Sequence, residues 1–307
     1  MAPPALIALF GPTGIGKTDL AVALAQRLRA GGEDPVAVSA DALQVYTGLE
    51  ILTGAATAAQ RTALEHRLLS FVPVDATFSA GQYAALAHAE IDGLLDAGRR
   101  PIVVGGTGLY LRAALTELSL RPAPAEGVRE RWLTDLERRG PEALHAILEL
   151  RAPWAAAEIA PSDRQRIVRA LELLDSGELE PPPERSQLWS EEVRHPTLLV
   201  GLVMDRERLY ARIEARVDAM LAGGVELEVR RASAQGASST ARQALGFKEL
   251  LAGDVEATKR YTRNYARRQL TWMRKLAGVT VLDATGRSPE DLATEVHARW
   301  LEGASGL

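Results

Sequence analysis

The chain has 307 residues, of which 47% are hydrophobic and 25% are charged, and its formal net charge is −4. These values are ordinary for a globular protein of one large domain or two modest ones, and we expect no membrane span, no signal peptide and a cytoplasmic location. The absence of cysteine excludes disulfides, Cys-ligated zinc and thiol nucleophiles, and the acidic balance confines any nucleic-acid site to a local basic patch.

A phosphate-binding loop is the first strong signal in the chain. Residues 11–18 read GPTGIGKT and fit the pattern G-x-x-x-x-G-K-[ST], between an apolar run at 5–10 and helical spacing over 19–30. In such a loop the glycines let backbone N–H groups point at phosphate oxygens, Lys17 adds a positive charge, and the Thr18 hydroxyl can hold Mg²⁺. The sequence therefore predicts a site for a di- or triphosphate, made by Gly11, Pro12, Thr13, Gly14, Ile15, Gly16, Lys17 and Thr18.

Two further apolar runs, at 35–39 and 101–104, predict buried parallel strands, with a helix over 79–95 between them. Asp41 follows the first run, and Thr107 lies in the Gly-Gly-Thr-Gly turn after the second. Ligands in open α/β sheets bind outside the carboxyl ends of the strands, so both side chains should face the phosphate loop. Asp41 could be a Mg²⁺ ligand, a general base or the N-cap of a helix, and its position alone leaves these roles open.

The middle of the chain changes character, because prolines recur there and no obvious β-type run is present. The clearest helix is expected over 163–175, where apolar residues including Ile167 share one stripe. We predict an all-helical insertion domain at 119–195 within an α/β core of residues 1–118 and 196–307. The core should be P-loop NTPase-like, a parallel sheet with helices on both faces.

Another parallel strand is expected at 197–203, followed by a helix over 208–221. Asp205 precedes that helix, and we interpret it as an N-cap rather than as a metal ligand. A short strand at 279–282 and a helix over 288–301 should close the fold.

A basic helix is predicted over 259–275, in a stretch of the chain that contains no acid between Ala257 and Leu282. At about 100° per residue, four arginines fall within a sector of roughly 60°; they are Arg260, Arg263, Arg267 and Arg274. Like charges on one face favour binding of a phosphate backbone, although a solvated surface is the alternative. An aromatic stripe beside them, which includes Tyr261, Tyr265 and Trp272, should lie in the core.

Motifs that the sequence lacks exclude some classes of phosphate-binding protein. The sequence has no N-K-x-D motif for guanine, and Asp205 is interpreted as a cap, so a GTPase or an ordinary motor ATPase is disfavoured. A transferase in which the phosphate group is donated or lost remains.

Seven motifs in order make the sequence similar to the bacterial tRNA dimethylallyltransferase (tRNA isopentenyltransferase) family. They are GPTGIGKT at 11–18, the S-x-D-x-x-Q-V-Y run at 39–46, VGGTGLYL at 104–111, DRQRIVRALE at 163–172, GLVMDRERLYARI at 201–213, RQALGFKEL at 242–250 and RNYARRQLTWMRK at 263–275. The resemblance implies transfer of a dimethylallyl group from dimethylallyl diphosphate to N6 of adenine 37 in the tRNA anticodon loop, with Mg²⁺ as cofactor and diphosphate as the leaving group. We expect a monomer, because no dimerisation signal is present.

The resemblance also implies roles for single residues. Asp41 becomes the general base, Thr107 fixes it, and Lys17 and Arg242 are cations on the diphosphate. The residues implied to contact tRNA are Asp41, Ala42, Leu43, Gln44, Thr107, Gln165, Arg166, Ile167, Val168 and Arg169, together with Arg260, Arg263, Arg267 and Arg274.

The sequence departs from the family pattern at three places. Ala42 stands where the family usually has Ser after the catalytic Asp, and the run at 53–57 lacks the lysine of Gly-Thr-Ala-Lys-Pro. The family's His-His-Leu reads His66-Arg67-Leu68 here. These changes put the local contacts and the rate in doubt more than the reaction.

Three alternative functions remain from the sequence. An isopentenyltransferase acting on free adenine nucleotides would need neither the insertion nor the arginine face. A small-molecule P-loop kinase would need an adenine pocket and a lid arginine, which we do not identify. An RNA-binding module that only senses a nucleotide would leave Asp41 and Thr107 unexplained.

Overall fold

The computed structural model describes residues 4–120, 127–181 and 187–305, which form two compact units. Unit 1 comprises residues 1–118 and 187–307, and unit 2 comprises residues 119–186. In the described part of the chain, we find no helix with the length and apolar character needed to cross a membrane.

Unit 1 is built on a six-stranded, all-parallel sheet of order β3-β2-β4-β1-β5-β6. The strands are β1 (Leu6–Phe10), β2 (Pro35–Ser39), β3 (His66–Arg67), β4 (Arg100–Gly105), β5 (Thr197–Val203) and β6 (Thr280–Asp283). Every residue of β1 and β2 is buried, as expected for strands that are covered on both faces. The apolar runs therefore predicted the central strands well, and β2 and β5 have the expected bounds.

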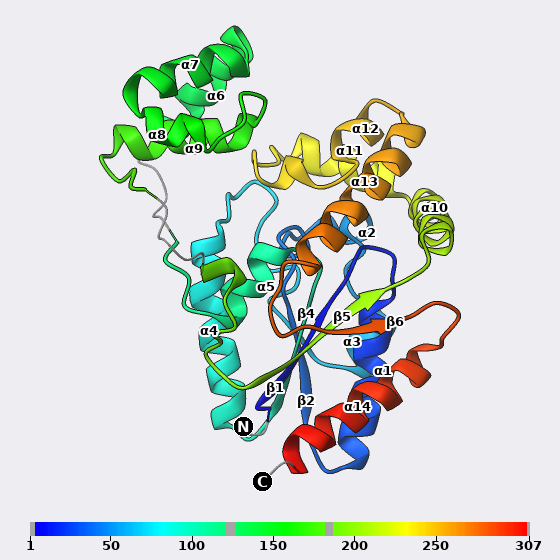
Figure 1. The fold of residues 1–307 in the computed structure, drawn as a ribbon. Coiled ribbons are helices and arrows are strands. Elements are labelled where there is room, and N and C mark those ends of the chain that lie inside the picture. The colour runs from blue at the N-terminus through cyan, green and yellow to red at the C-terminus, as the bar shows by residue number, and fades with distance from the viewer. Residues whose placement is uncertain (1–3, 121–126, 182–186, 306–307) are drawn as a thin grey trace. The chain divides into compact units, whose positions relative to one another are not determined.

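Helices cover both faces of the sheet (Figure 1). α1 (Lys17–Ala30) packs with α14 (Pro289–Ser305) on one face, and their apolar side chains join those of β1 in the main core. α4 (Ala80–Asp96) and α5 (Gly108–Leu115) lie against β2 and β4 on the other face. This arrangement confirms the predicted fold class.

The remaining helices of unit 1 lie beyond the carboxyl ends of the strands or along the sheet edge (Figure 1). They are α2 (Glu50–Thr53), α3 (Ala58–Ala63), α10 (Arg206–Ala222), α11 (Val225–Ala234), α12 (Phe247–Leu251) and α13 (Val255–Met273), with 3-10 turns at Gln187–Trp189 and Ala241–Gln243. Asp205 caps α10 by accepting N–H donation from Glu207 and Arg208, which confirms the predicted cap. The basic helix α13 begins at Val255, before the predicted start at residue 259, because Asp254 caps it.

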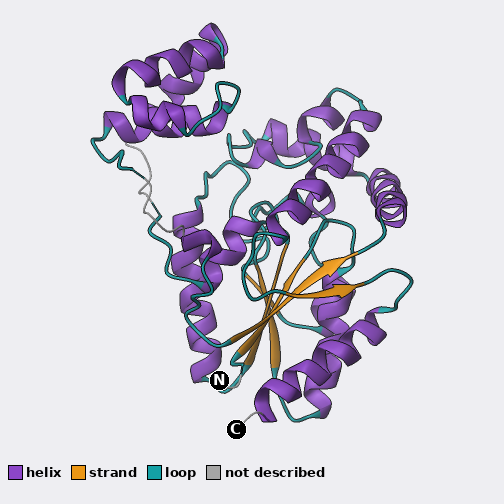
Figure 2. Ribbon diagram, viewed as in Figure 1, coloured by secondary structure: helices purple, strands orange, loops and turns teal. Residues whose placement is uncertain are grey.

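Unit 2 contains only helices among its described regular elements (Figure 2). These are α6 (Val128–Arg139), α7 (Pro141–Arg151), α8 (Pro153–Ala157) and α9 (Arg164–Asp175). They have a hydrophobic core of their own, which includes Trp132, Leu144, Leu148 and Ile167.

Residues 187–195 belong with unit 1, although we expected the insertion to extend to residue 195. The buried guanidinium of Arg112 in α5 donates to the carbonyl oxygens of Gln187 (2.9 Å) and Glu192 (3.3 Å). Arg194 donates to both carboxylate oxygens of Asp92 in α4, at 3.2 and 2.8 Å. These bonds fasten the returning chain to the helices beside β4.

Candidate active site

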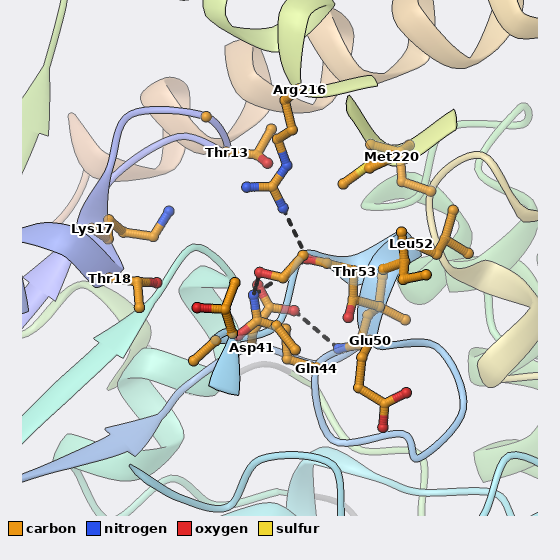
Figure 3. Close-up of a pocket in the computed structure, with 18 of the residues that line it drawn as sticks. Thr13, Lys17, Thr18, Asp41, Gln44, Glu50, Leu52, Thr53, Arg216 and Met220 are labelled. Atoms are coloured by element: carbon orange, nitrogen blue, oxygen red, sulfur yellow. Dashed lines mark hydrogen bonds between the residues drawn. The ribbon is translucent and has the colours of Figure 1, made fainter. Parts of the chain in front are cut away.

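A cavity of about 1000 Å³ lies at the carboxyl end of the sheet in unit 1 (Figure 3). The phosphate loop, the residues after β2, the segment from Glu50 to Arg61, and faces of α10 and α13 form its walls. The residues that matter below are Thr13, Lys17, Thr18, Asp41, Gln44, Thr53, Gly54, Arg216, Tyr265 and Gln269. The parallel strands therefore gather the predicted loop and Asp41 at one site, as the rule for open α/β sheets requires.

The phosphate loop has the backbone that its glycines were expected to provide. Gly14 and Gly16 have φ angles of 81° and 98°, a region that side-chain-bearing residues rarely adopt, and α1 begins at Lys17. The first N–H groups of a helix have no partner within it, so they are available to an anion. The Thr13 N–H is different, because it donates to Gln269 Oε1 of α13 at 2.8 Å.

Lys17, Arg216 and Asp41 all line the cavity, together with the basic residues Arg61 and Arg212 and the acidic residues Asp19 and Glu50. Burial lowers the pKa of Lys17 to about 8; the Asp41 carboxylate opposes this shift and the Arg216 guanidinium adds to it. The Lys17 ammonium donates to the carbonyl oxygens of Gly11 (2.9 Å) and Pro12 (3.0 Å). Burial also lowers the pKa of Arg216, against the effect of Asp41. Two half-buried cations that lose part of their hydration in this way favour an anionic ligand.

Arg216 is a site residue that we did not predict. It extends from α10 toward the phosphate loop (Figure 3) and donates to the Thr53 carbonyl oxygen at 3.0 Å. Gly54 leaves room for it, because a Cβ at position 54 would lie 1.8 Å from an Arg216 nitrogen. Arg212, one turn earlier in α10, donates to the Gly14 carbonyl oxygen at 2.8 Å. The spacing of these two arginines, i and i+4 on a helix that follows a core strand, was the available signal.

Arg242 does not take the place that we predicted for it. Its Nε donates to the Ala237 carbonyl oxygen at 2.8 Å, and its guanidinium lies 5.6 Å from the centre of the Phe247 ring. It is not among the residues that line the cavity, whereas Arg216 is. Arg216 therefore lies in the cavity wall with Lys17, where we had expected Arg242.

Asp41 lies in a loop rather than at the start of a helix, so the N-cap interpretation is wrong. Its Oδ1 accepts from the Leu43 N–H at 3.0 Å. Thr107 lies behind this loop, where its hydroxyl accepts from the Ala42 N–H at 3.3 Å and is 3.4 Å from the Tyr265 hydroxyl. Thr107 thus holds the Asp41 loop through the backbone.

Tyr265 and Gln44 complete the surroundings of Asp41. Burial raises the pKa of Tyr265 to about 12, with a further contribution from Asp41, so its hydroxyl stays protonated. Gln44 Nε2 donates to the carbonyl oxygens of Thr53 and Gly54, both at 3.3 Å. Leu43 lines the cavity beside Gln44.

The four arginines of the predicted basic face on α13 lie in different environments. Arg260, Arg267 and Arg274 are exposed, whereas Arg263 is half-buried and pairs with Glu214 of α10 at 2.7 Å. Tyr261 is also exposed, so the aromatic stripe is not wholly in the core as we expected.

The predicted tRNA contacts in unit 2 are divided as well. Ile167 and Val168 are buried in the core of that unit, so their side chains offer no surface to RNA. Arg169 pairs with the buried Glu172 at 3.1 Å. Gln165 and Arg166 are exposed on the first turn of α9.

The side chains around the cavity determine whether a Mg²⁺ ion could be held there. The described residues contain no group of three or more His, Cys, Asp or Glu side chains that could hold a metal ion. The Thr18 side chain does line the cavity. These residues fit a Mg²⁺ ion that takes most of its ligands from a bound diphosphate and water, with one from Thr18, since Mg²⁺ commonly binds with few protein ligands.

Comparison with known proteins gives a consistent result. The family model for IPP transferase matches residues 44–276. The chain is 42% identical to a tRNA dimethylallyltransferase of Kineococcus radiotolerans, over 95% of each chain, and 43% identical to one of Anaeromyxobacter dehalogenans, over 96% of this chain and 99% of that one.

Solved structures agree. The full-length tRNA isopentenylpyrophosphate transferase of Bacillus halodurans has a TM-score of 0.70 and 32% identity, covering 98% of this chain and 97% of that one. A eukaryotic dimethylallyltransferase acting on tRNA has a TM-score of 0.72 and 25% identity, covering 95% of this chain and 77% of that one. These tRNA dimethylallyltransferases are relatives of the chain, which therefore belongs to the IPP transferase family.

Proposed function

We propose that this protein transfers a dimethylallyl group from dimethylallyl diphosphate to N6 of adenine 37 in the anticodon loop of tRNA and releases diphosphate. The observation that carries the proposal is that one cavity is lined by a phosphate loop, by the half-buried cations Lys17 and Arg216, and by the Asp41 carboxylate. The family relationship supplies the substrates.

The phosphate loop and its cations assist the departure of the leaving group. In an allylic diphosphate the bond between C1 and oxygen breaks more readily when the negative charge that develops on the diphosphate is stabilised. Lys17, Arg216 and the free N–H groups at the start of α1 are fixed in place before the substrate arrives, so they stabilise this charge with little reorganisation. A Mg²⁺ ion at Thr18 would add Lewis-acid stabilisation of the same charge.

Asp41 assists the acceptor. The N6 lone pair of adenine is delocalised into the ring, so the amine becomes nucleophilic only as it loses a proton. As the bond from N6 to C1 forms and the C1–O bond breaks, the N6 proton passes to the Asp41 carboxylate. Thr107 and Leu43 hold the loop that carries this carboxylate.

The RNA surface rests on separate residues. We assign tRNA backbone contacts to the exposed arginines Arg260, Arg267 and Arg274 of α13 and to Arg166 of unit 2, because exposed cations bind phosphates without regard to sequence. The target adenine must leave the base stack to reach Asp41. Gln44 lines the cavity and is the residue that we assign to reading its edge.

One assay tests the proposed reaction. The protein is incubated with Mg²⁺ and dimethylallyl diphosphate labelled in the allyl group, and with unmodified tRNA, AMP or no acceptor. We expect label in tRNA alone, and none in a tRNA whose position 37 is guanine. Label in AMP would favour the nucleotide-specific alternative, and phosphorylation of a metabolite by ATP without label in tRNA would favour a kinase.

A further inference from the structure

Glu228 is an acidic residue of α11 that binds the start of a short helix in the cavity wall. Its two carboxylate oxygens accept the N–H groups of Ile51 and Leu52 in α2, each at 2.8 Å. The first N–H groups of a helix lack intrahelical partners, and a carboxylate there also meets the positive end of the helix dipole. Burial raises the pKa of Glu228 and Glu50 adds to the shift, while the two N–H bonds oppose it. Glu228 therefore pays a desolvation cost to make this contact.

The other end of α2 holds Arg216. The Thr53 carbonyl oxygen accepts from the Arg216 guanidinium at 3.0 Å and from Gln44 at 3.3 Å (Figure 3). α2 has only four residues, so its ends are about 6 Å apart and move as one body. A shift at Ile51 and Leu52 is thus transmitted to the carbonyl that holds Arg216.

Hydrophobic contacts alone do not set this position. Leu49 and Leu52 are buried in the cluster formed with α11 and α12, but hydrophobic burial is not directional and permits small rotations of a single helical turn. The two hydrogen bonds to Glu228 are directional, and they fix the rotation of α2 about its axis.

We propose that Glu228 is a positioning residue for the leaving diphosphate, acting through α2 and the Thr53 carbonyl on Arg216. This role rests on the proposed function, in which Arg216 neutralises the diphosphate. Glu228 does not line the cavity, so its effect on the ligand must pass through these contacts.

A double-mutant cycle with inorganic pyrophosphate as the probe tests this role. Binding is measured by calorimetry in the presence of Mg²⁺ for the wild type, Glu228→Gln, Arg216→Ala and the double variant. Glu228→Gln replaces one of the two carboxylate oxygens by an amide NH2 group, which cannot accept a hydrogen bond from the backbone N–H of Ile51 or Leu52. We therefore expect pyrophosphate to bind about three- to tenfold more weakly. In the Arg216→Ala background we expect the same change to have no effect, because its target is gone.

The controls separate positioning from general destabilisation. Glu226→Gln changes the first turn of the same helix α11 and should leave pyrophosphate binding unaltered. Unweakened binding in Glu228→Gln, or equal weakening in both backgrounds, would overturn the proposal. If Glu228→Gln does not fold, Glu228→Asp, which keeps the charge but cannot reach both N–H groups, takes its place with the same expected outcomes. Because the probe needs no tRNA, failure of the proposed transfer reaction would be seen separately.

Discussion

Asp41 and Lys17 reach the same cavity from the ends of β2 and β1, with β4 between these strands. In the proposed reaction their charges have opposite tasks, since Asp41 accepts a proton from the acceptor while Lys17 stabilises the leaving group. Each can therefore be removed without removing the other, and the two losses should be distinguishable.

Asp41→Asn should abolish proton acceptance while leaving both substrates bound. We expect turnover to fall by about 10² to 10⁴-fold, the range typical of a lost general base. Single-turnover transfer of labelled dimethylallyl measures the loss, and filter binding checks that tRNA affinity is retained. Turnover close to that of the wild type would remove Asp41 as the base.

Lys17 should make the stability of the ligand-free protein depend on pH in an unusual direction. Its pKa is about 8 in the folded protein against 10.5 for an ordinary lysine, so between these pH values the unfolded chain binds the proton more tightly. Raising the pH through this window therefore raises the free energy of unfolding attributable to Lys17, by about 3 kcal/mol. Urea unfolding across this range should show the rise in the wild type relative to Lys17→Met. Parallel pH curves for the two proteins would contradict the assignment.

At the scale of elements, α13 joins the proposed RNA surface to the proposed reaction centre. Tyr265, Gln269 and Trp272 follow one another along its inner side; Gln269 donates to the Gly106 carbonyl oxygen at 2.7 Å, and a Cβ on Gly108 would lie 2.1 Å from Trp272. Arg267 and Arg274 are exposed on the same helix. Arg263 differs from them because Glu214 already neutralises it.

The arginines of α13 should therefore contribute unequally to tRNA binding. Arg267→Ala and Arg274→Ala should each reduce the slope of log K against log salt concentration by about 1. Arg263→Ala should change that slope less, because its guanidinium is paired with Glu214. Titrations of tRNA at several salt concentrations compare the three variants. Equal slopes for all of them and the wild type would make this face an ordinary solvated surface.

The parts of the site that were predictable from the sequence are those set by local pattern. Apolar runs placed Asp41 at the end of a strand, and Gly14 and Gly16 indicated the phosphate loop. The parts that were not predictable depend on partners far along the chain. Gln269 occupies the Thr13 N–H from 256 residues away, and nothing near Arg242 indicates that it turns to the Ala237 carbonyl. The helical stripe at 163–175 did predict burial of Ile167, so the tRNA contact that the resemblance implied there conflicted with the pattern itself.

At the scale of the molecule, the cavity and the helical core around α9 belong to different units. Unit 1 holds the cavity, and unit 2 has its own apolar core and its own buried ion cluster. In that cluster the fully buried Glu172 pairs with Arg129 at 3.0 Å and with Arg169 at 3.1 Å. Removing the carboxylate leaves two half-buried cations without their shared partner, which is costly.

Glu172→Ala should loosen unit 2 without altering the diphosphate site. We expect unit 2 to lose about 3–5 kcal/mol of stability, while pyrophosphate binding by unit 1 stays within twofold. Hydrogen exchange followed by mass spectrometry should show faster exchange in α6–α9 and unchanged exchange in β1, β2 and β4. Ala at Glu137, an exposed glutamate of α6, is the matched control. Faster exchange in both units would show that they do not unfold independently.

The inner contacts of α13 have a consequence for how much its length can vary. An inserted or deleted residue turns everything beyond it by about 100° around the helix axis. Between Arg260 and Tyr265, such a change would carry the tyrosine and Gln269 away from Thr107 and Thr13 or displace the arginines, because one continuous helix carries both sets. Residues can therefore vary at the exposed positions of this helix other than the arginines, but the number of residues in it cannot. The contacts of this helix with Thr13 and Thr107 thus fix the spacing between its inner side chains and its arginines.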